Sequence, residues 1–271
     1  MAKSLSASRA KGIASSEAGA RRKSARLVAR RSKPNDTAVQ KTKKKHHWNY
    51  DVTDKSKGPT GWPMVDGHAQ SPIDLKMSRA KTIQLTQNER LKFHLYDSEI
   101  HGEFVNTGKS LQFRPDINAI VPVISGGLLD QPYRFVQYHY HWSEDENKGS
   151  EHAIDGRFYA AELHLVHEGV NDASKLAVLG VFLEANASAS AAEFNADLAA
   201  LRMVQECGQH TPAGGQRLAD KLLASSPFAR YSGSLTTPPC TENVTWTLFT
   251  QPKILARDAL QQLVRQQIFI M

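Results

Sequence analysis

Apolar and polar residues alternate along much of the chain, in short stretches bounded by clusters of Gly, Pro, Asn and Asp. This spacing predicts β-strands joined by turns. The alternating stretches lie at 102–115, 133–142, 158–169, 176–185 and 243–251. Two other segments, 191–206 and 257–267, carry apolar residues at helical spacing instead. We therefore expect a mostly β fold with a few short helices.

Positive charge is concentrated at the start of the chain, whose 271 residues carry a formal net charge of +7. Residues 1–47 contain 14 Lys or Arg and only Glu17 and Asp36 as acids, whereas the remaining residues hold more acids than bases. Because residues 1–47 have almost no large apolar side chains, they cannot bury enough surface to fold alone. We predict a disordered basic tail or presequence at 1–47 and a folded domain at 48–271.

The same tail bears on the compartment of the protein. It lacks the apolar segment of a secretory signal peptide, and no stretch of the chain approaches the roughly 20 apolar residues of a transmembrane helix. Cys207 and Cys240 have no companion motif, which indicates thiols in a reducing environment. We expect an intracellular and most simply cytoplasmic protein, with a mitochondrial or plastid presequence as the alternative. No aromatic-interleaved binding module follows the tail, so no specific nucleic-acid partner is expected.

Two histidines stand two residues apart in the sequence YHYHW at 138–142. Side chains of a strand alternate between its faces, so His139 and His141 share one face. His164, in AELHLVHEG, joins them if its strand lies beside the first. Either the imidazoles satisfy one another in a polar patch, or they hold a metal ion between them. Taken alone, the spacing leaves both interpretations open.

Three neutral imidazoles would suit a catalytic zinc ion, because they leave its charge uncompensated and a fourth coordination position open for water. Ligand histidines also need their second ring nitrogen held by a hydrogen bond. Gln137 and Glu162 each lie two residues from a histidine, on the same predicted strand face. They are therefore the expected partners of these second nitrogens.

Several longer strings surround these histidines: QSPIDL at 70–75, GSEH at 149–152, AAELHLVH at 160–167, LAVLGVFL at 176–183 and YSGSLTTPPCTENVTW at 231–246. Together they closely resemble the α-class carbonic anhydrases, from about Trp48 to about Trp246. The resemblance implies a large, twisted and predominantly antiparallel sheet, with zinc at the base of a conical cleft. It also implies a zinc lyase that hydrates carbon dioxide reversibly to bicarbonate and a proton, by attack of zinc hydroxide.

The resemblance assigns roles to individual residues. His139, His141 and His164 match the zinc ligands, and Thr236 matches a residue that donates its hydroxyl proton to Glu151 and thereby orients the hydroxide. The backbone N–H of Thr236 is expected to meet anions and sulfonamide inhibitors. The substrate pocket implied for carbon dioxide consists of Val166, Val178, Leu235, Thr237 and Trp246.

One departure from the family concerns proton export. Lys109 occupies the position where fast members carry a proton-shuttle histidine, and a lysine with a reference pKa near 10.4 is a poor match to a donor near neutrality. His46 and His47 precede Trp48 and are an alternative relay. The other interpretation is that both are simply tail residues.

A second departure concerns the end of the chain. After the helix predicted at 257–267 the sequence stops at IFIM, whereas family members continue through a further loop and strand. The resemblance implies that a backbone carbonyl in that part steadies the ligand at His141. We therefore expect a C-terminally incomplete member.

Three function hypotheses remain. The first is a monomeric carbon dioxide hydratase, and the second is a non-catalytic, carbonic-anhydrase-like binding protein whose activity was lost with the C-terminus. The third is an unrelated metal barrel of cupin type with Glu146 as a carboxylate ligand, which the sequence disfavours because the expected glycine is absent. The remaining histidines, including His152 and His167, are interpreted as structural or exposed.

Overall fold

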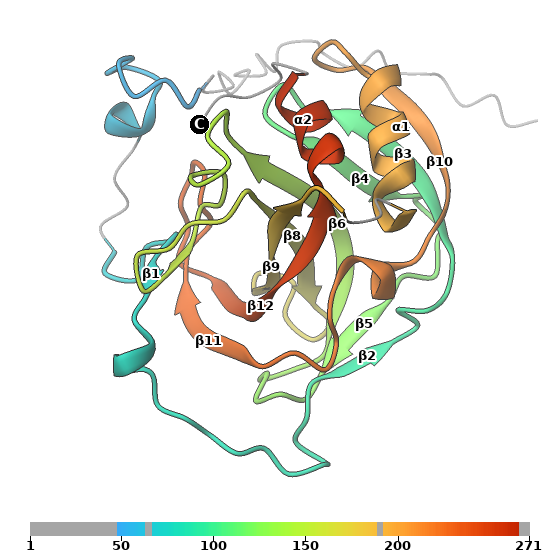
Figure 1. Ribbon diagram of the computed structural model, residues 1–271. Helices are drawn as coiled ribbons and strands as arrows, with labels where there is room; N and C mark the ends of the chain where they lie inside the picture. The colour runs from blue at the N-terminus through green and yellow to red at the C-terminus, as the bar shows by residue number, and fades with distance from the viewer. Residues whose placement is uncertain (1–47, 63–66, 189–191, 266–271) are drawn as a thin grey trace, which may run out of the picture. The chain divides into compact units, whose positions relative to one another are not determined.

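One large sheet forms the centre of the protein (Figure 1). The computed structural model describes residues 48–62, 67–188 and 192–265. The predicted tail at 1–47 lies outside the described residues. Of the described strands, ten belong to this sheet and two form a small separate one. The prediction of a mostly β fold is therefore confirmed.

The strands of the large sheet are β2 (Lys92–His94), β3 (Ile100–Asn106), β4 (Leu111–Pro115), β5 (Val123–Ser125), β6 (Tyr133–Trp142), β8 (Ala161–Gly169), β9 (Leu176–Asn186), β10 (His210–Gln216), β11 (Phe228–Gly233) and β12 (Val244–Ala256). Their spatial order is β10-β3-β4-β6-β8-β9-β12-β11, and β5 pairs with both β2 and β6. The small sheet pairs β1 (Asp74–Leu75) with β7 (Ala153–Ile154). Neighbours in the large sheet are antiparallel except for β9 and β12, which are parallel.

Short helices complete the described part of the chain. The two α-helices, α1 (Asn195–Met203) and α2 (Arg257–Arg265), lie on the same side of the sheet in Figure 1. Single turns of 3-10 helix are η1 (Pro59–Gly61), η2 (Met77–Arg79), η3 (Ala192–Phe194) and η4 (Leu218–Lys221). Among the described residues, no helix has both the length and the apolar character needed to cross a bilayer.

The two faces of the sheet bury different sets of side chains. On the helix-covered face, Tyr138, Tyr140 and Leu163 pack with Leu198 of α1 and Leu260 of α2 in the main core. The opposite face carries His139, His141 and His164 beside a smaller apolar cluster. This division follows from the alternation of side chains along β8, and along β6 after its irregularity between Phe135 and Gln137. Strand β9 is buried on both faces, as its continuous apolar run indicates.

The prediction of a helix at 191–206 was too long at its C-terminal end. The α-helix ends at Met203, and Val204 has left helical backbone geometry, with φ −117° and ψ 65°. Val204 is fully buried, and its carbonyl accepts a hydrogen bond from the Asn106 side chain at 3.0 Å. A tertiary contact therefore ends the helix where the periodicity of the sequence continues.

Candidate metal centre

The pairing of β6 with β8 places the three predicted histidines together. In the antiparallel register His139 lies directly opposite His164, and His141 lies opposite Glu162. A register irregularity between Phe135 and Gln137 shifts the pairing just before the histidines. Because directly opposed residues of an antiparallel pair point to the same face, the register brings all three imidazoles to one spot.

The three imidazoles are close enough to share one ion. A nitrogen atom from each of His139, His141 and His164 lies within 4.8 Å of the other two. Their ring centroids are 4.9 Å (His139 to His141), 5.2 Å (His139 to His164) and 4.5 Å (His141 to His164) apart. We call these residues the histidine cluster. His141 and His164 are buried, and His139 is the most exposed of the three.

Two of the three rings have a hydrogen-bond partner on their own strand. Nδ1 of His139 lies 2.9 Å from Oε1 of Gln137, and Nε2 of His164 lies 2.8 Å from Oε1 of Glu162. These bonds fix the orientation of both rings and leave one nitrogen of each ring for a metal.

His141 has a different kind of partner, Glu151. The family resemblance implied Glu151 only as the acceptor of the Thr236 hydroxyl proton. Nδ1 of His141 lies 3.2 Å from Oε1 of Glu151, which belongs to the connection between β6 and β7. The other carboxylate oxygen, Oε2, lies 3.9 Å from Nδ1 of His164. Thr236 also interacts with the Glu151 carboxyl and opposes the rise of its pKa. Glu151 therefore contacts the histidine cluster directly.

Burial keeps all three imidazoles neutral. It lowers the pKa of His139 to about 3, with the neighbouring His164 adding to this effect and Glu162 opposing it. Burial likewise lowers the pKa of His141, aided by His164 and His139. For His164, burial lowers the pKa although Glu162 acts in the opposite direction. Neutral imidazole is the form that binds a metal ion.

The two buried carboxyls have opposite shifts. Burial would raise the pKa of Glu162, but its interactions with His152 and His164 outweigh burial and hold that pKa well below the usual range. Burial and the nearby charge of Glu162 raise the pKa of Glu151. A cation in the histidine cluster would act against this rise, because an opposite charge favours the ionised form.

The donor set fits a zinc ion. Nε2 of His141 and Oε2 of Glu151 are buried and have no hydrogen-bond partner among the described residues. Buried polar atoms are costly when left unpaired. Three neutral histidines with oriented rings form a donor set typical of catalytic zinc. His139, His141 and His164 are thus the residues that would hold the metal.

Apolar side chains line up beside the cluster. One row across the sheet pairs Gln137 with Val166, Val166 with Val178, and Val178 with Trp246. Val178 and Trp246 belong to the smaller apolar cluster, against which Val166 and Leu235 pack. The ring of Trp246 lies 4.8 Å from that of His164, centroid to centroid. Four of the five residues predicted for the substrate pocket therefore meet in one apolar cluster.

The segment that carries Thr236 and Thr237 is attached to this apolar row by a hydrogen bond from Trp246. Nε1 of Trp246 donates to the carbonyl of Ser234 at 3.0 Å. Within the segment, the backbone N–H of Leu235 donates to the carbonyl of Thr241 at 3.1 Å, and the carbonyl of Thr237 accepts from the N–H of Cys240 at 2.9 Å. These bonds fix the backbone from which both threonine side chains project.

Lys109 lies in the turn between β3 and β4, and β4 pairs directly with β6, the strand of His139 and His141. Its Nζ stands 4.8 Å from the centroid of the Trp48 ring, a cation–π contact. Partial burial lowers the pKa of Lys109, although the nearby Cys207 opposes the shift. The alternative relay residues, His46 and His47, lie outside the described residues.

Comparison with known proteins gives the family. The family model for eukaryotic-type carbonic anhydrase matches residues 44–269. The chain is 44% identical over 216 residues to "Putative carbonic anhydrase 3" of Caenorhabditis elegans, covering 79% of this chain and 85% of that protein. It is 33% identical to carbonic anhydrase 1 of Mus musculus, covering 80% of this chain and 85% of that protein. It is 34% identical to carbonic anhydrase 7 of Homo sapiens, covering 76% and 81%. The chain belongs to the eukaryotic-type carbonic anhydrase family.

Two features of this family member were not predicted from the sequence. The first is a buried chain of hydrogen bonds next to the histidine cluster. Nδ1 of His152 lies 2.7 Å from Glu162 Oε1, and its Nε2 lies 2.6 Å from the Tyr231 hydroxyl. His152, Glu162 and His164 also approach closely enough to form a metal-type group. Because both nitrogens of His152 already have partners, we interpret this group as support for His164. His152 is therefore a structural histidine, one of the two interpretations that the sequence allows.

The second is Gly180, which lies opposite His164 on β9. A Cβ atom here would stand 2.6 Å from Cδ2 of Leu248 and 3.1 Å from Oε1 of Glu162. Only glycine therefore lets β9 approach the carboxylate that orients His164. The sequence signal was a single glycine inside an apolar run, which indicates close backbone approach.

The cupin-type alternative, which the sequence disfavours, does not fit the structure. Glu146 does not join the histidine cluster but forms an ion pair with Arg257 at 3.2 Å. His167, interpreted from the sequence as facing away from the cluster, is buried in the core. Its Nε2 lies 2.6 Å from the Tyr96 hydroxyl.

Proposed function

We propose that the protein catalyses the zinc-dependent, reversible hydration of carbon dioxide to bicarbonate and a proton. The observation that carries the proposal is the histidine cluster: three neutral imidazoles, each oriented by a partner, with an unpaired buried nitrogen on His141. Membership of the carbonic anhydrase family supports the same reaction. The intact cluster gives no support to the non-catalytic alternative.

Zinc held by three histidines supplies the acidity that turns water into a nucleophile near neutral pH, and carbonic anhydrase is the standard example of this effect. The residues of the chain supply the ligands for the ion and orient the ligand rings. His139, His141 and His164 would hold the ion as neutral donors, while Gln137 and Glu162 accept the second ring N–H of His139 and His164. Rigid ligands favour one geometry of the ion over others.

Thr236 and Glu151 would orient the nucleophile. If Glu151 accepts the proton of the Thr236 hydroxyl, the threonine oxygen is left only as an acceptor. It then selects a nucleophile that donates a hydrogen bond to it, and turns the nucleophile's lone pair toward the substrate. The interaction of Thr236 with the Glu151 carboxyl supports this arrangement. The backbone N–H of Thr236 is the proposed contact for anions and sulfonamides.

The apolar row beside the cluster suits carbon dioxide, which has no net dipole. Val166, Val178, Leu235 and Trp246 offer it a dry surface, and Thr237 stands next to it in sequence. Excluding water from this surface also strengthens the electrostatic interactions at the cluster. Because every group named here comes from one chain, the proposed reaction works in the predicted monomer.

The proposal is tested by zinc content and carbon dioxide hydration on the purified chain. We expect one zinc per chain, with His164→Ala removing most of the metal and the activity. Thr236→Ala should keep the zinc and lose much of kcat, because it removes orientation and not a ligand. His94→Ala is the matched control, since His94 is an exposed strand histidine whose ring contacts Ser125. Stoichiometric zinc in His164→Ala would refute the ligand assignment.

A further inference from the structure

The two tyrosines that alternate with the histidines of β6 share one buried carboxylate. The hydroxyls of Tyr138 and Tyr140 both donate to Oδ1 of Asp197, at 2.8 Å and 2.7 Å. All three side chains are at most 2% exposed. Asp197 lies in the first turn of α1, on the face of the sheet opposite to the histidine cluster. One oxygen atom of α1 is therefore bonded to the residues on both sides of His139.

A buried cation holds the same carboxylate from its other side. Oδ2 of Asp197 forms an ion pair with Nζ of Lys221, which lies in η4 and is 2% exposed. That Nζ also donates to the carbonyl of Glu193 at 2.7 Å, and it lies 5.0 Å from the centroid of the Phe194 ring. The carboxylate is thus fixed by groups from α1, η3 and η4 together.

Stability alone does not account for this buried pair. Removing a carboxylate and an ammonium from water carries a large desolvation cost, and apolar side chains of similar volume are often as stabilising or more so. Buried pairs of this kind can instead fix one arrangement of the elements that they connect. The elements connected here are α1, η4 and the part of β6 that carries two of the three proposed metal ligands.

The position of β6 matters for the ligands as much as the orientation of their rings. Gln137 and Glu151 hold the rings of His139 and His141, but neither bond fixes the strand against the helices on its other face. The tyrosine hydroxyls do so, because a shift of β6 past α1 would stretch both bonds to Asp197. Ligands of a metal site must be held to within about 0.5 Å of their working geometry.

We propose that Asp197, held by Lys221, is a positioning residue for the metal ligands: through the hydroxyls of Tyr138 and Tyr140 it fixes the stretch of β6 from which His139 and His141 project. The inference rests on the proposed function, because it takes the histidine cluster to hold zinc.

The rate of zinc release to an excess of chelator tests the proposal on the zinc-loaded chain. Tyr140→Phe should release zinc about threefold faster and Tyr138→Phe together with Tyr140→Phe about tenfold faster. Tyr138→Phe alone should have the smallest effect, since Oε1 of Gln216 also accepts from the Tyr138 hydroxyl, at 3.1 Å.

Tyr133→Phe is the matched control. Tyr133 is a fully buried residue of the same strand, and its hydroxyl donates to Oδ1 of Asp130 at 2.6 Å. The substitution therefore removes an equivalent hydrogen bond six residues before His139, and zinc release should keep the rate of the unmutated chain. Urea unfolding of every metal-free variant is measured alongside, and the release rates should not follow the free energies of unfolding.

Two charge-free pairs of substitutions isolate the acceptor for the hydroxyls. Asp197→Asn with Lys221→Met removes both charges but keeps an amide oxygen, so zinc release should stay within about twofold of the unmutated chain. Asp197→Leu with Lys221→Met has a similar volume but no acceptor, and zinc release should be about tenfold faster. If the Leu variant does not fold, the tyrosine variants decide.

The metal-free chain gives a second readout that does not depend on zinc. With ¹⁵N in the histidine rings, Tyr138→Phe together with Tyr140→Phe should shift the ring signals of His139 and His141. The signals of His152, whose ring is held by Glu162 and Tyr231, should stay in place.

The two readouts separate the two proposals. If the unmutated chain binds no zinc, the proposed function fails, and the ring signals alone decide whether Asp197 positions β6. Unmoved signals of His139 and His141 overturn the inference. It is also overturned if Tyr133→Phe releases zinc as fast as Tyr140→Phe, or if Asp197→Leu with Lys221→Met releases zinc at the rate of the unmutated chain.

Discussion

Oε1 of Glu151 lies 3.2 Å from Nδ1 of His141, so a carboxyl from a connecting segment holds a ring that projects from β6. His139 and His164 are held by residues of their own strands, Gln137 and Glu162. His141 alone depends on a residue outside the sheet. Its orientation is therefore tied to the position of the segment between β6 and β7.

Glu151→Gln should loosen the metal without removing a ligand. The amide keeps the size of the carboxyl but loses its charge, so His141 is held less firmly, and we expect zinc affinity to fall about tenfold. The rate of carbon dioxide hydration should fall as well, because Thr236 loses its carboxylate acceptor. Chelator competition and initial rates measure the two effects. Glu146→Gln in the same segment is the control and should retain wild-type zinc affinity; an equal loss there would contradict the assignment.

Gly180→Ala should disturb the histidine cluster through Glu162, the partner of His164. The new methyl group would press on Leu248 and on Glu162, and overpacking of this kind costs about 1–3 kcal/mol. We expect a lower free energy of unfolding in urea and weaker zinc binding, because Glu162 orients His164. Gly214→Ala, where a Cβ meets no atom within 4 Å, is the matched control. Unchanged zinc affinity in Gly180→Ala would show that Glu162 tolerates displacement.

The metal-free chain should lose stability on acidification. Burial lowers the pKa of His139 to about 3 and of His167 to about 4, and also lowers those of His141 and His164. Unfolded histidine titrates near 6.5, so below that pH the unfolded chain binds more protons than the folded one. The stabilisation is complete above about pH 6.5 and decreases as the pH falls toward 4. Glu151, whose pKa is raised, acts with the opposite sign, but it is one group against four.

Each histidine contributes a slope of at most about 1.4 kcal/mol per pH unit. Urea midpoints of the chelated chain, measured from about pH 7 to about pH 5, should therefore fall steeply. Zinc should make the urea midpoint depend less on pH near neutrality, because bound metal competes with protons for His139, His141 and His164. A stability that is constant over this range without metal would mean that the imidazoles are not buried in the neutral form.

Lys109→His should speed proton export. Lys109 sits over the Trp48 ring with a pKa below its usual range, yet a lysine remains a poorer match than imidazole to a donor near neutrality. We expect a severalfold rise in kcat with little change in kcat/KM, because kcat/KM reports the hydration step that precedes export. Added imidazole buffer should raise kcat of the unmutated chain in the same way. A flat response in both experiments would remove Lys109 from the proton path.

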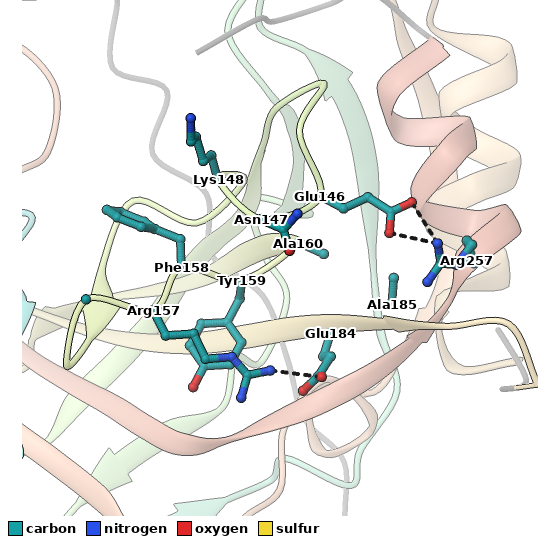
Figure 2. A pocket seen from close by; sticks show the side chains of 11 residues that line it. Glu146, Asn147, Lys148, Arg157, Phe158, Tyr159, Ala160, Glu184, Ala185 and Arg257 are labelled. Carbon is teal, nitrogen blue, oxygen red and sulfur yellow. Dashed lines mark hydrogen bonds and ion pairs between the residues drawn. The ribbon is translucent and has the colours of Figure 1, made fainter.

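The alternation of side chains was enough to predict the central strands and the shared face of His139 and His141. It did not predict β10, because Pro212 and two glycines interrupt the pattern of that strand. Partners close in sequence, such as Gln137, were also predictable. The contact of Glu151 with His141 was not, since it depends on where a connecting segment folds over the sheet. The cavity shown in Figure 2 is lined by four separate segments, at 146–148, 156–160, 184–185 and Arg257, and only tertiary structure brings these together.

The parallel pairing of β9 with β12 sets an order of assembly. Strands β6, β8 and β9 follow one another as an antiparallel meander, whereas β12 can join β9 only after a crossover that runs from Asn186 to Val244. Closing that longer loop carries a larger entropic cost and slows folding. We therefore expect His139, His141 and His164 to meet before Trp246 reaches its place, so that a refolding chain binds zinc before the fluorescence of Trp246 becomes native.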